Sequence, residues 1–518
     1  MKRHWKIIVT LIVVLPIILA IWMAMMRSEG QNAVDNYRKS LIAKGEKFEI
    51  AELVSPSVPP EQNGADTVSQ AFGMLIASGF DTTNYPYAMR LIAPAKAIVG
   101  FRQPDVRSFD FTNNWPAVMT FAAYNRPATE LLRRAMNFSA LDFHLNYSLG
   151  PELRIPHVNR LSTGIQRLSA EAMCDLHNGD AASAATNIYV MLALANGEQN
   201  ERLLITQIIR RSNILLAAND NWELLQSTNL NDAELAMLQK SWERLEFVAA
   251  LENAFLMERA SFELDIKRLR TSRDFDGMLG YNLSWRFSGD WSDNFDEVKG
   301  HLAHSYAVFM WHASWTYSDE LQTLQNLQII LETLRTIQTN GCFDPAYTNM
   351  VNQLDAANMR LDSSDWDNGL KWMFSGFSSG DGKVVARIME AETAREIVIT
   401  AIALKRYQLK YGKYPQDLKS LAPEFVAVVP PDPIDGQPLR YRLNGDGTFL
   451  LYSIGPDGKD DGGDAANPKI RETDYHWLDP HNYTWLNLDA PDWVWPQPAT
   501  PTETQYFYEH PPNNRYTY

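Results

Sequence analysis

The sequence is poor in cysteine, has no excess of positive charge and lacks the common nucleotide-binding motifs. Its 518 residues include two cysteines, Cys174 and Cys342, which form neither a CxxC pair nor a disulfide framework. The two could pair with each other outside the cytoplasm, but Cys174 is better explained as a small apolar residue on a helix. The net charge of −15 leaves no basic patch for nucleic acid. GxGxxG, HExxH and a P-loop are absent.

Charge is also missing from residues Ile7 to Met26, where Thr10 is the only polar side chain. A helix of that length covers about 30 Å, the thickness of the hydrocarbon core of a bilayer. Basic residues precede the stretch, so the positive-inside rule places the N-terminus in the cytoplasm. A cleaved signal peptide is the alternative, although the apolar run is long for one and no A-x-A site follows it. We predict an uncleaved signal anchor over residues 7–26, with the lipid bilayer as its partner.

Helical patterns dominate the sequence from about residue 66 to residue 374. In LSTGIQRLSAEAMCDLH, residues 161–177, apolar side chains recur every three or four positions. Asn178, Gly179 and Asp180 should end that helix and cap the next one, AASAATNIYVMLALAN. The pair resembles one tetratricopeptide unit, but no regular repeat follows it. We therefore expect an irregular array of α-helices.

Different signals follow the Gly- and Ser-rich segment at residues 375–382. A long helix is predicted from about Val384 to Tyr411, with Gly412 as its C-terminal stop. A β-hairpin should then form from PLRYRL and TFLLYSI, because the turn sequence Asn444 to Gly447 lies between them.

The C-terminal tail, residues 471–518, is rich in proline and tryptophan, including Trp477, Trp485, Trp493 and Trp495. These aromatic side chains could stack on sugars or bind a partner peptide. We favour a tail that docks its aromatics on the rest of the protein, because a solvated tail this apolar would form a large exposed patch.

Several short motifs of the C-terminal part stand in the order and spacing found in one known family. They are Tyr411-Gly412-Lys413-Tyr414-Pro415, Asp432-Pro433, the strand from Gly436 to Tyr441, and Tyr452-Ser453-Ile454-Gly455 followed by Asp457-Gly458. In these motifs the chain resembles the soluble domain of the major pseudopilin of type II secretion systems. The resemblance implies a long helix packed on an antiparallel sheet. It covers roughly residues 384–465, and no prepilin cleavage motif precedes the apolar helix, so the chain would carry this domain as a module and would not be a fibre subunit.

In the major pseudopilins the loop after the last strand binds calcium. The corresponding stretch here is YSIGPDGKDDGGD, residues 452–464. The resemblance implies a calcium site with Asp457 at the family's aspartate position, and Asp460, Asp461 and Asp464 supply further carboxylates. The family's later aspartate falls near Pro468 and has no counterpart. A solvated acidic turn is the alternative.

One further metal candidate lies in the sequence EVKGHLAH. Glu297, His301 and His304 would fall on one face of a helix and could bind zinc. A packing role is favoured, because two histidines near Trp311 and Trp315 are more often part of a core. No catalytic residue is assigned.

These observations predict an α+β protein with a cytoplasmic N-terminus at 1–6, a transmembrane anchor at 7–26, a linker at 27–65, an α-helical domain at 66–374, a linker at 375–382, a pseudopilin-like domain at 383–470 and the tail at 471–518. The whole chain resembles membrane-anchored bacterial envelope proteins without an established activity, which implies one pass through the bacterial inner membrane and a periplasmic body. We expect an extracytoplasmic scaffold or binding protein for an envelope protein partner. The alternative is an envelope hydrolase acting on glycans or peptides.

Overall fold

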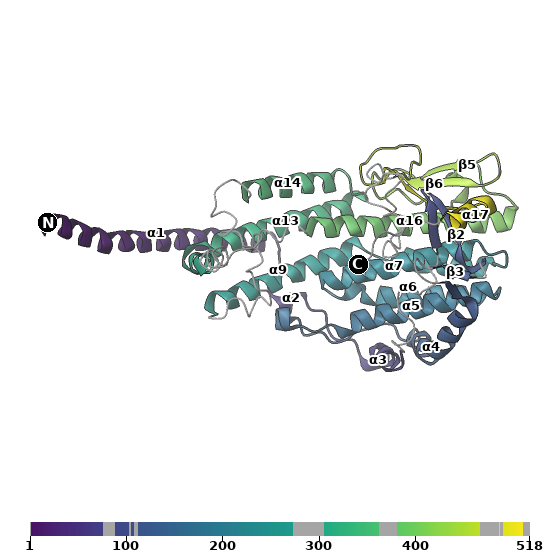
Figure 1. Ribbon diagram of the computed structural model, residues 1–518, viewed down its shortest axis with the longest axis horizontal. Helices are drawn as coiled ribbons and strands as arrows, with labels where there is room; N and C mark the ends of the chain where they lie inside the picture. Colours follow the sequence, from purple (N-terminus) through teal and green to yellow (C-terminus); the bar gives the residue numbers. More distant parts are fainter. Residues whose placement is uncertain are drawn as a thin grey trace.

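The computed structural model describes residues 2–75, 89–102, 105–107, 112–272, 305–361, 381–466, 486 and 490–510. In this part of the chain the protein is mostly helical, and its short strands form three small sheets. A mixed α+β class, as predicted, is compatible with this composition. Figure 1 shows one helix, α1, that projects from one end of the molecule, while strands β5 and β6 lie near the other end.

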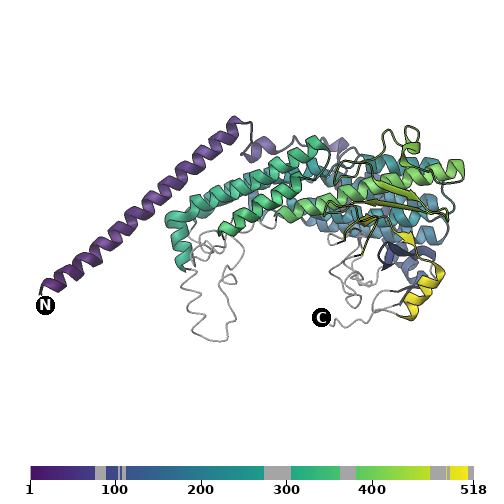
Figure 2. The same ribbon diagram turned by 90° about the horizontal axis from the view of Figure 1, so that it is seen from above.

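Helix α1 runs without interruption from Lys2 to Ala43. Most of its apolar part projects away from the other described elements, as Figure 2 shows, and Leu15 and Ile18 are 66% and 58% exposed. By length and composition α1 can cross a membrane, and no other helix in the described ranges passes the same test. The predicted anchor at residues 7–26 is therefore a single apolar helix near the N-terminus.

The predicted linker at residues 27–65 is wrong in its first half. Residues 27–43 continue α1, because Val34 and Leu41 recur at a seven-residue spacing and are buried against helix α13, Thr316–Asn340. The sequence of this stretch looks polar because only one face of the helix is covered. The second half contains two short helical turns, α2 (Ile50–Leu53) and η1 (Pro60–Gln62).

The body is an array of helices. They are α3 (Ala65–Met74), α4 (Trp115–Ala135), α5 (Pro156–His177), α6 (Ala181–Gly197), α7 (Leu204–Leu225), α8 (Asp232–Glu243), α9 (Val248–Thr271), α13 and α14 (Ala346–Leu361). The predicted pair α5–α6 is confirmed: Gly179 turns the chain with a φ of +81°, and the Asp180 carboxylate accepts a hydrogen bond from the Ser183 amide at 3.0 Å. Local capping signals therefore suffice to form this pair.

Helix α16, Asp381–Tyr411, confirms the predicted long helix. It ends at Gly412, whose φ is +75° and whose amide donates to the Gln408 carbonyl at 2.8 Å. The helix packs on α7 and α8, and its buried side chains belong to the same hydrophobic core as those of α5 and α6. The predicted helical domain and the predicted C-terminal module therefore share one hydrophobic core. They share it because α16 has buried apolar side chains on several faces, such as Ile397, Ile399 and Ile402.

The predicted hairpin is confirmed by β5 (Arg440–Leu443) and β6 (Phe449–Ser453), which pair antiparallel with Arg440 opposite Tyr452. A third strand comes from the tail: β7, Trp493–Val494, pairs with the end of β6. Two further sheets are small. One contains β1 (Met89–Ala93), β2 (Lys96–Val99) and β8 (Gln497–Pro498), and the other contains β3 (Asp105–Arg107) and β4 (Thr112–Asn114).

The tail docks on the body, as predicted, over its described residues. Trp493 and Trp495 are buried, and the Trp222 indole on α7 donates to the Pro496 carbonyl at 2.8 Å. Strand β8 then pairs with β2, and helix α17 (Pro501–Glu509) follows. Trp477 and Trp485 lie outside the described residues. The tail thus links the β5–β6 sheet to the helical array.

A buried charge cluster joins the end of α1 to the body. The Glu46 carboxylate accepts hydrogen bonds from Arg259 of α9 at 2.8 Å, from Gln328 of α13 at 3.1 Å, and from Arg335 of α13. Arg259 is fully buried and stacks on the Phe48 ring at 4.4 Å. Burial alone would raise the pKa of Glu46, but the hydrogen bonds from these three side chains outweigh it and lower the pKa from 4.5 to about 2. Glu46 therefore stays ionised and holds α1 against two helices.

The first prediction concerns this cluster. Glu46→Gln should lower the free energy of unfolding of the detergent-solubilised protein at pH 7 by about 3 kcal/mol, since each pKa unit is worth about 1.4 kcal/mol. A lowered pKa stabilises the fold above the unfolded value, so the difference between wild type and variant should shrink as the pH falls from 4.5 towards 2. Urea unfolding at a series of pH values measures this. Glu29→Gln, on an exposed part of α1, is the control and should change little. A constant difference across the pH range would contradict the assignment.

Candidate functional site

The acidic stretch at residues 452–464 leaves the end of β6 and folds back beside the tail. Two of its glycines are required by the close approach of other chain segments. Gly455 has a φ of +69°, and a Cβ there would lie 2.0 Å from the Pro491 carbonyl oxygen. Gly463 has a φ of +87°, and a Cβ there would meet the Leu450 side chain at 2.9 Å. The glycines therefore allow a compact loop that packs against the tail.

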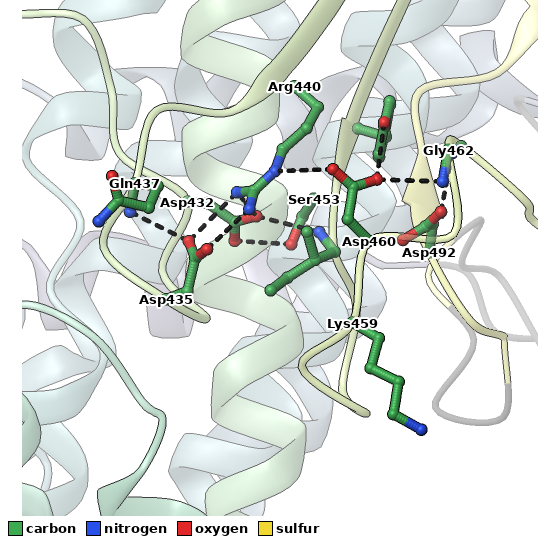
Figure 3. A network of polar contacts seen from close by, with 12 residues as sticks. Asp432, Asp435, Gln437, Arg440, Ser453, Lys459, Asp460, Gly462 and Asp492 are labelled. Atoms are coloured by element: carbon green, nitrogen blue, oxygen red, sulfur yellow. Dashed lines mark hydrogen bonds and ion pairs between the residues drawn. The ribbon is translucent and has the colours of Figure 1, made fainter.

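Arg440, on β5, lies at the centre of a polar network around this loop (Figure 3). Its guanidinium donates to Asp435 at 2.7 Å and to Asp432 at 3.0 Å, and its Nε lies 3.7 Å from the Asp460 carboxylate. Burial works to raise the pKa of Asp435, but the hydrogen bonds from Arg440 outweigh it and the pKa is lowered. Lys459 points away from the network, so Arg440 is the cation that offsets these carboxylates.

Asp432 is the buried member of the network. Its carboxylate has no exposure and accepts hydrogen bonds from the Ser453 hydroxyl at 2.7 Å and from the Ile434 and Ile454 amides, each at 3.0 Å. Burial raises the pKa of Asp432, and these donors together with Arg440 oppose the increase. Asp432 belongs to the Asp-Pro motif of the pseudopilin resemblance, but the sequence did not indicate that it joins the proline loop to the end of β6.

Two further aspartates order the loop itself. Asp460 accepts hydrogen bonds from the Gly462 amide at 3.0 Å and from the Tyr452 hydroxyl at 2.9 Å, and both lower its pKa. Burial and Asp460 raise the pKa of Tyr452 to about 12.

Asp492, from the tail, is almost fully buried and accepts from the Gly463 amide at 2.8 Å and from the Asp464 amide at 3.0 Å. Burial raises the pKa of Asp492, and these amides oppose the increase. Sequence reasoning missed Asp492, because no spacing rule connects it to a loop nearly thirty residues earlier.

The four predicted calcium ligands do not converge. Asp457 and Asp464 accept hydrogen bonds from the backbone amides of Lys459 and Ala466, Asp461 is exposed, and only Asp460 turns towards Arg440. In the part of the chain that the structure describes, no group of three or more His, Cys, Asp or Glu side chains could hold a metal ion. The loop presents several backbone amides to Asp492 and Asp460. Calcium binding here stays a prediction.

The other predicted residues are the three possible zinc ligands and the two cysteines. Glu297, His301 and His304 lie outside the described residues. Cys174 and Cys342 are both free, so the alternative of a disulfide between them is wrong. Burial raises the pKa of the Cys174 thiol to about 12, which agrees with its interpretation as a small apolar residue on α5.

The network is suited to holding segments together. Each of its carboxylates accepts from an arginine, a hydroxyl or a backbone amide, and Arg440 stands between Asp432, Asp435 and Asp460. Such charge-assisted hydrogen bonds are stronger than neutral ones and fix geometry. The network joins the proline loop, the hairpin, the acidic loop and the tail.

Comparisons with protein-family models, with curated proteins and with solved structures found nothing that matches this chain. The resemblance of residues 383–470 to the major pseudopilins therefore stays a prediction.

The second prediction tests Arg440. Arg440→Met should lower the free energy of unfolding by about 3–5 kcal/mol, because it leaves the buried Asp432 carboxylate without its cation. The control is Arg442→Met, two positions along the same strand, where the side chain is exposed. Chemical denaturation of the full-length protein in detergent measures both. Equal effects of the two substitutions would show that the network does not stabilise the fold.

The third prediction distinguishes stabilisation of the acidic loop by Asp492 of the tail from stabilisation by calcium. Asp492→Ala should lower the free energy of unfolding by about 1.5–3 kcal/mol in chelator and in calcium alike, because the amides of the acidic loop lose a charged acceptor. Asp457→Ala should have little effect in chelator, since Asp457 is exposed.

Calcium is tested with the same proteins. If the loop binds one ion, calcium at a hundred times its Kd should stabilise the wild type by about 2.7 kcal/mol, and Asp457→Ala should remove that gain. Identical melting temperatures of the wild type in calcium and in chelator would contradict calcium binding and leave the acidic loop ordered by Asp492 and Arg440 alone.

Proposed function

We propose that this protein is a membrane-anchored scaffold or binding protein whose helical body stands on the periplasmic face of the bacterial inner membrane. The observation that carries the proposal is the division of α1 into two parts. In the part of the chain that the structure describes, residues 13–22 of its apolar part are exposed, whereas its second part packs on α13 and leads to the Glu46 cluster. A helix of this kind would fix the position of the body relative to the bilayer.

The exposed apolar surface of α1 supports lipid as its surroundings. Leu15, Ile18 and Ile21 are each more than half exposed. Leaving apolar surface in water costs about 25 cal/mol for each square ångström, so a helix with such a surface is stable only where lipid or another apolar partner covers it. The basic residues before position 7 support a cytoplasmic N-terminus and therefore a periplasmic body.

A scaffold is favoured over the alternative of an envelope hydrolase. General acid–base catalysis requires carboxyl groups with shifted pKa values that substrate can reach. Asp175 and Asp265 have pKa values raised to about 6 by burial and are partly exposed, but each already faces a polar partner, Asn187 and Arg268 respectively. Larger increases occur deeper in the fold, for example at Asp220 and Glu223 on α7: burial raises the pKa of Asp220 to about 7 and the pKa of Glu223 well above its usual range. Both side chains have no exposure, and the Glu223 carboxylate accepts from the Gly100 amide at 2.9 Å. Their place inside the helical array supports a structural role.

Within this proposal the C-terminal network keeps the sheet and the tail in one arrangement. The sheet lies at the end of the body far from the N-terminus of α1 (Figure 1). A partner in the envelope would therefore be held away from the membrane surface. Calcium remains a proposed stabiliser of the acidic loop.

The fourth prediction concerns topology. Alkaline phosphatase fused to the C-terminus of the full chain should be active in intact bacteria, and a reporter that works only in the cytoplasm should be inactive at the same place. Deleting residues 2–26 should reverse both results, because the apolar helix is the only described segment that could carry the chain into the membrane. A mature protein that begins after Met26 would instead show that the helix is a cleaved signal sequence.

The scaffold role is tested with the same anchored protein. Crosslinking in intact cells followed by isolation of the full chain should recover an envelope protein in fixed proportion, and the chain without residues 2–26 should not recover it. Cleavage of glycans or peptides by the purified full-length protein would establish the hydrolase instead.

A further inference from the structure

An uncharged aromatic segment precedes α13. Residues 305–318, SYAVFMWHASWTYS, contain no Asp, Glu, Lys or Arg. Residues 305–310 are helical, and the five-residue π-helix η6, Trp311–Trp315, joins them to α13. The segment has two faces. Ala307, Met310 and Trp311 are buried, whereas Phe309 is 57% and Tyr306 is 38% exposed. The exposed face is therefore aromatic and without charge.

The segment is fixed beside the last turn of the apolar part of α1. Met23 packs against a cluster that contains Ala307, Met310 and Trp311 together with Ile266 and Leu269 of α9. Four residues further along α1, the Arg27 guanidinium donates to the His312 carbonyl. The segment thus lies at the level where the uncharged stretch of α1 ends and its first charge begins.

We propose that residues 305–315 form a second membrane contact, with the exposed face of this segment lying in the interfacial zone of the bilayer that holds α1. This inference rests on the proposed anchoring by α1. On α1 itself, Trp22 and Met25 are 47% and 57% exposed, and Met23 between them packs on the segment, so both elements present exposed apolar side chains near this level of α1. Tryptophan and tyrosine are enriched in that zone, because their rings are apolar and their polar atoms can reach water.

The charges nearest the segment are arranged in agreement with this placement. Asp319, the first carboxylate after the segment, is fully buried and accepts a hydrogen bond from the Trp311 indole at 3.0 Å. It therefore presents no charge to lipid. The backbone of the segment is helical, so its amides and carbonyls are satisfied internally, as an interfacial helix requires. Burying the Phe309 and Tyr306 rings in lipid removes apolar surface from water.

The experiment places an environment-sensitive fluorophore on single cysteines of the full-length protein. Phe309→Cys and Tyr306→Cys probe the exposed face, Met25→Cys probes the anchor, and Val428→Cys, on a surface loop that is 77% exposed, is the control. Each variant also carries Cys342→Ser, and the buried Cys174 is left in place. The proteins are reconstituted in phosphatidylcholine–phosphatidylglycerol vesicles that contain a lipid with a nitroxide just below its headgroup. Thermal unfolding confirms that each labelled variant keeps the wild-type fold.

The proposal expects quenching and a blue shift for the probes at positions 25, 309 and 306, and neither change at position 428. Quenching at position 25 with probes at 309 and 306 that behave like the one at 428 would overturn this inference and leave the anchor intact. Absence of quenching at position 25 would overturn the anchoring itself, and the second contact with it.

Discussion

The buried ion pair between Glu46 and Arg259 is the interaction on which the arrangement of this protein depends. Arg259 is fully buried on α9, and without the carboxylate its charge would have no counter-ion inside the fold. Because Gln328 and Arg335 of α13 donate to the same carboxylate, one residue connects three helices. The position of the apolar part of α1 relative to the body follows from this connection.

Arg440 also joins several chain segments through one charged side chain. At Glu46 that side chain is an anion surrounded by donors, whereas Arg440 is a cation surrounded by carboxylates. Here one cation binds the carboxylates of Asp432 and Asp435 from the proline loop and lies beside the carboxylate of Asp460 from the acidic loop, and Asp492 adds the tail. The hydrophobic core alone does not specify how these loops lie, because most of their side chains are small or polar. Charged hydrogen bonds have directional geometry and therefore select one arrangement. Both networks join segments that are distant in the sequence.

Local signals account for the parts of the fold that the sequence predicted correctly. The α5–α6 pair, α16 and the β5–β6 hairpin each have their capping or turn residues next to them, such as Gly179 and Gly412. Tertiary contacts account for what was missed. Residues 27–43 form a helix because α13 covers Val34 and Leu41, and Asp492 reaches the acidic loop only after the tail has docked. The sequence also singled out the acidic loop as a metal site, which stays a prediction. In the structure its aspartates turn to separate partners, and no pattern in the sequence specifies those partners.

The continuity of α1 has a mechanical consequence. Between the apolar part and the Glu46 cluster there is no flexible joint, since the helix is unbroken to Ala43 and is packed on the body from Met23 onwards. Once the apolar part is in a bilayer, a change in its tilt rotates the whole body by the same angle. The largest displacement then falls on the end that carries β5 and β6, because that end is farthest from the N-terminus of α1. Bilayer thickness, which sets the tilt of a membrane helix, thereby sets how far from the membrane that sheet stands.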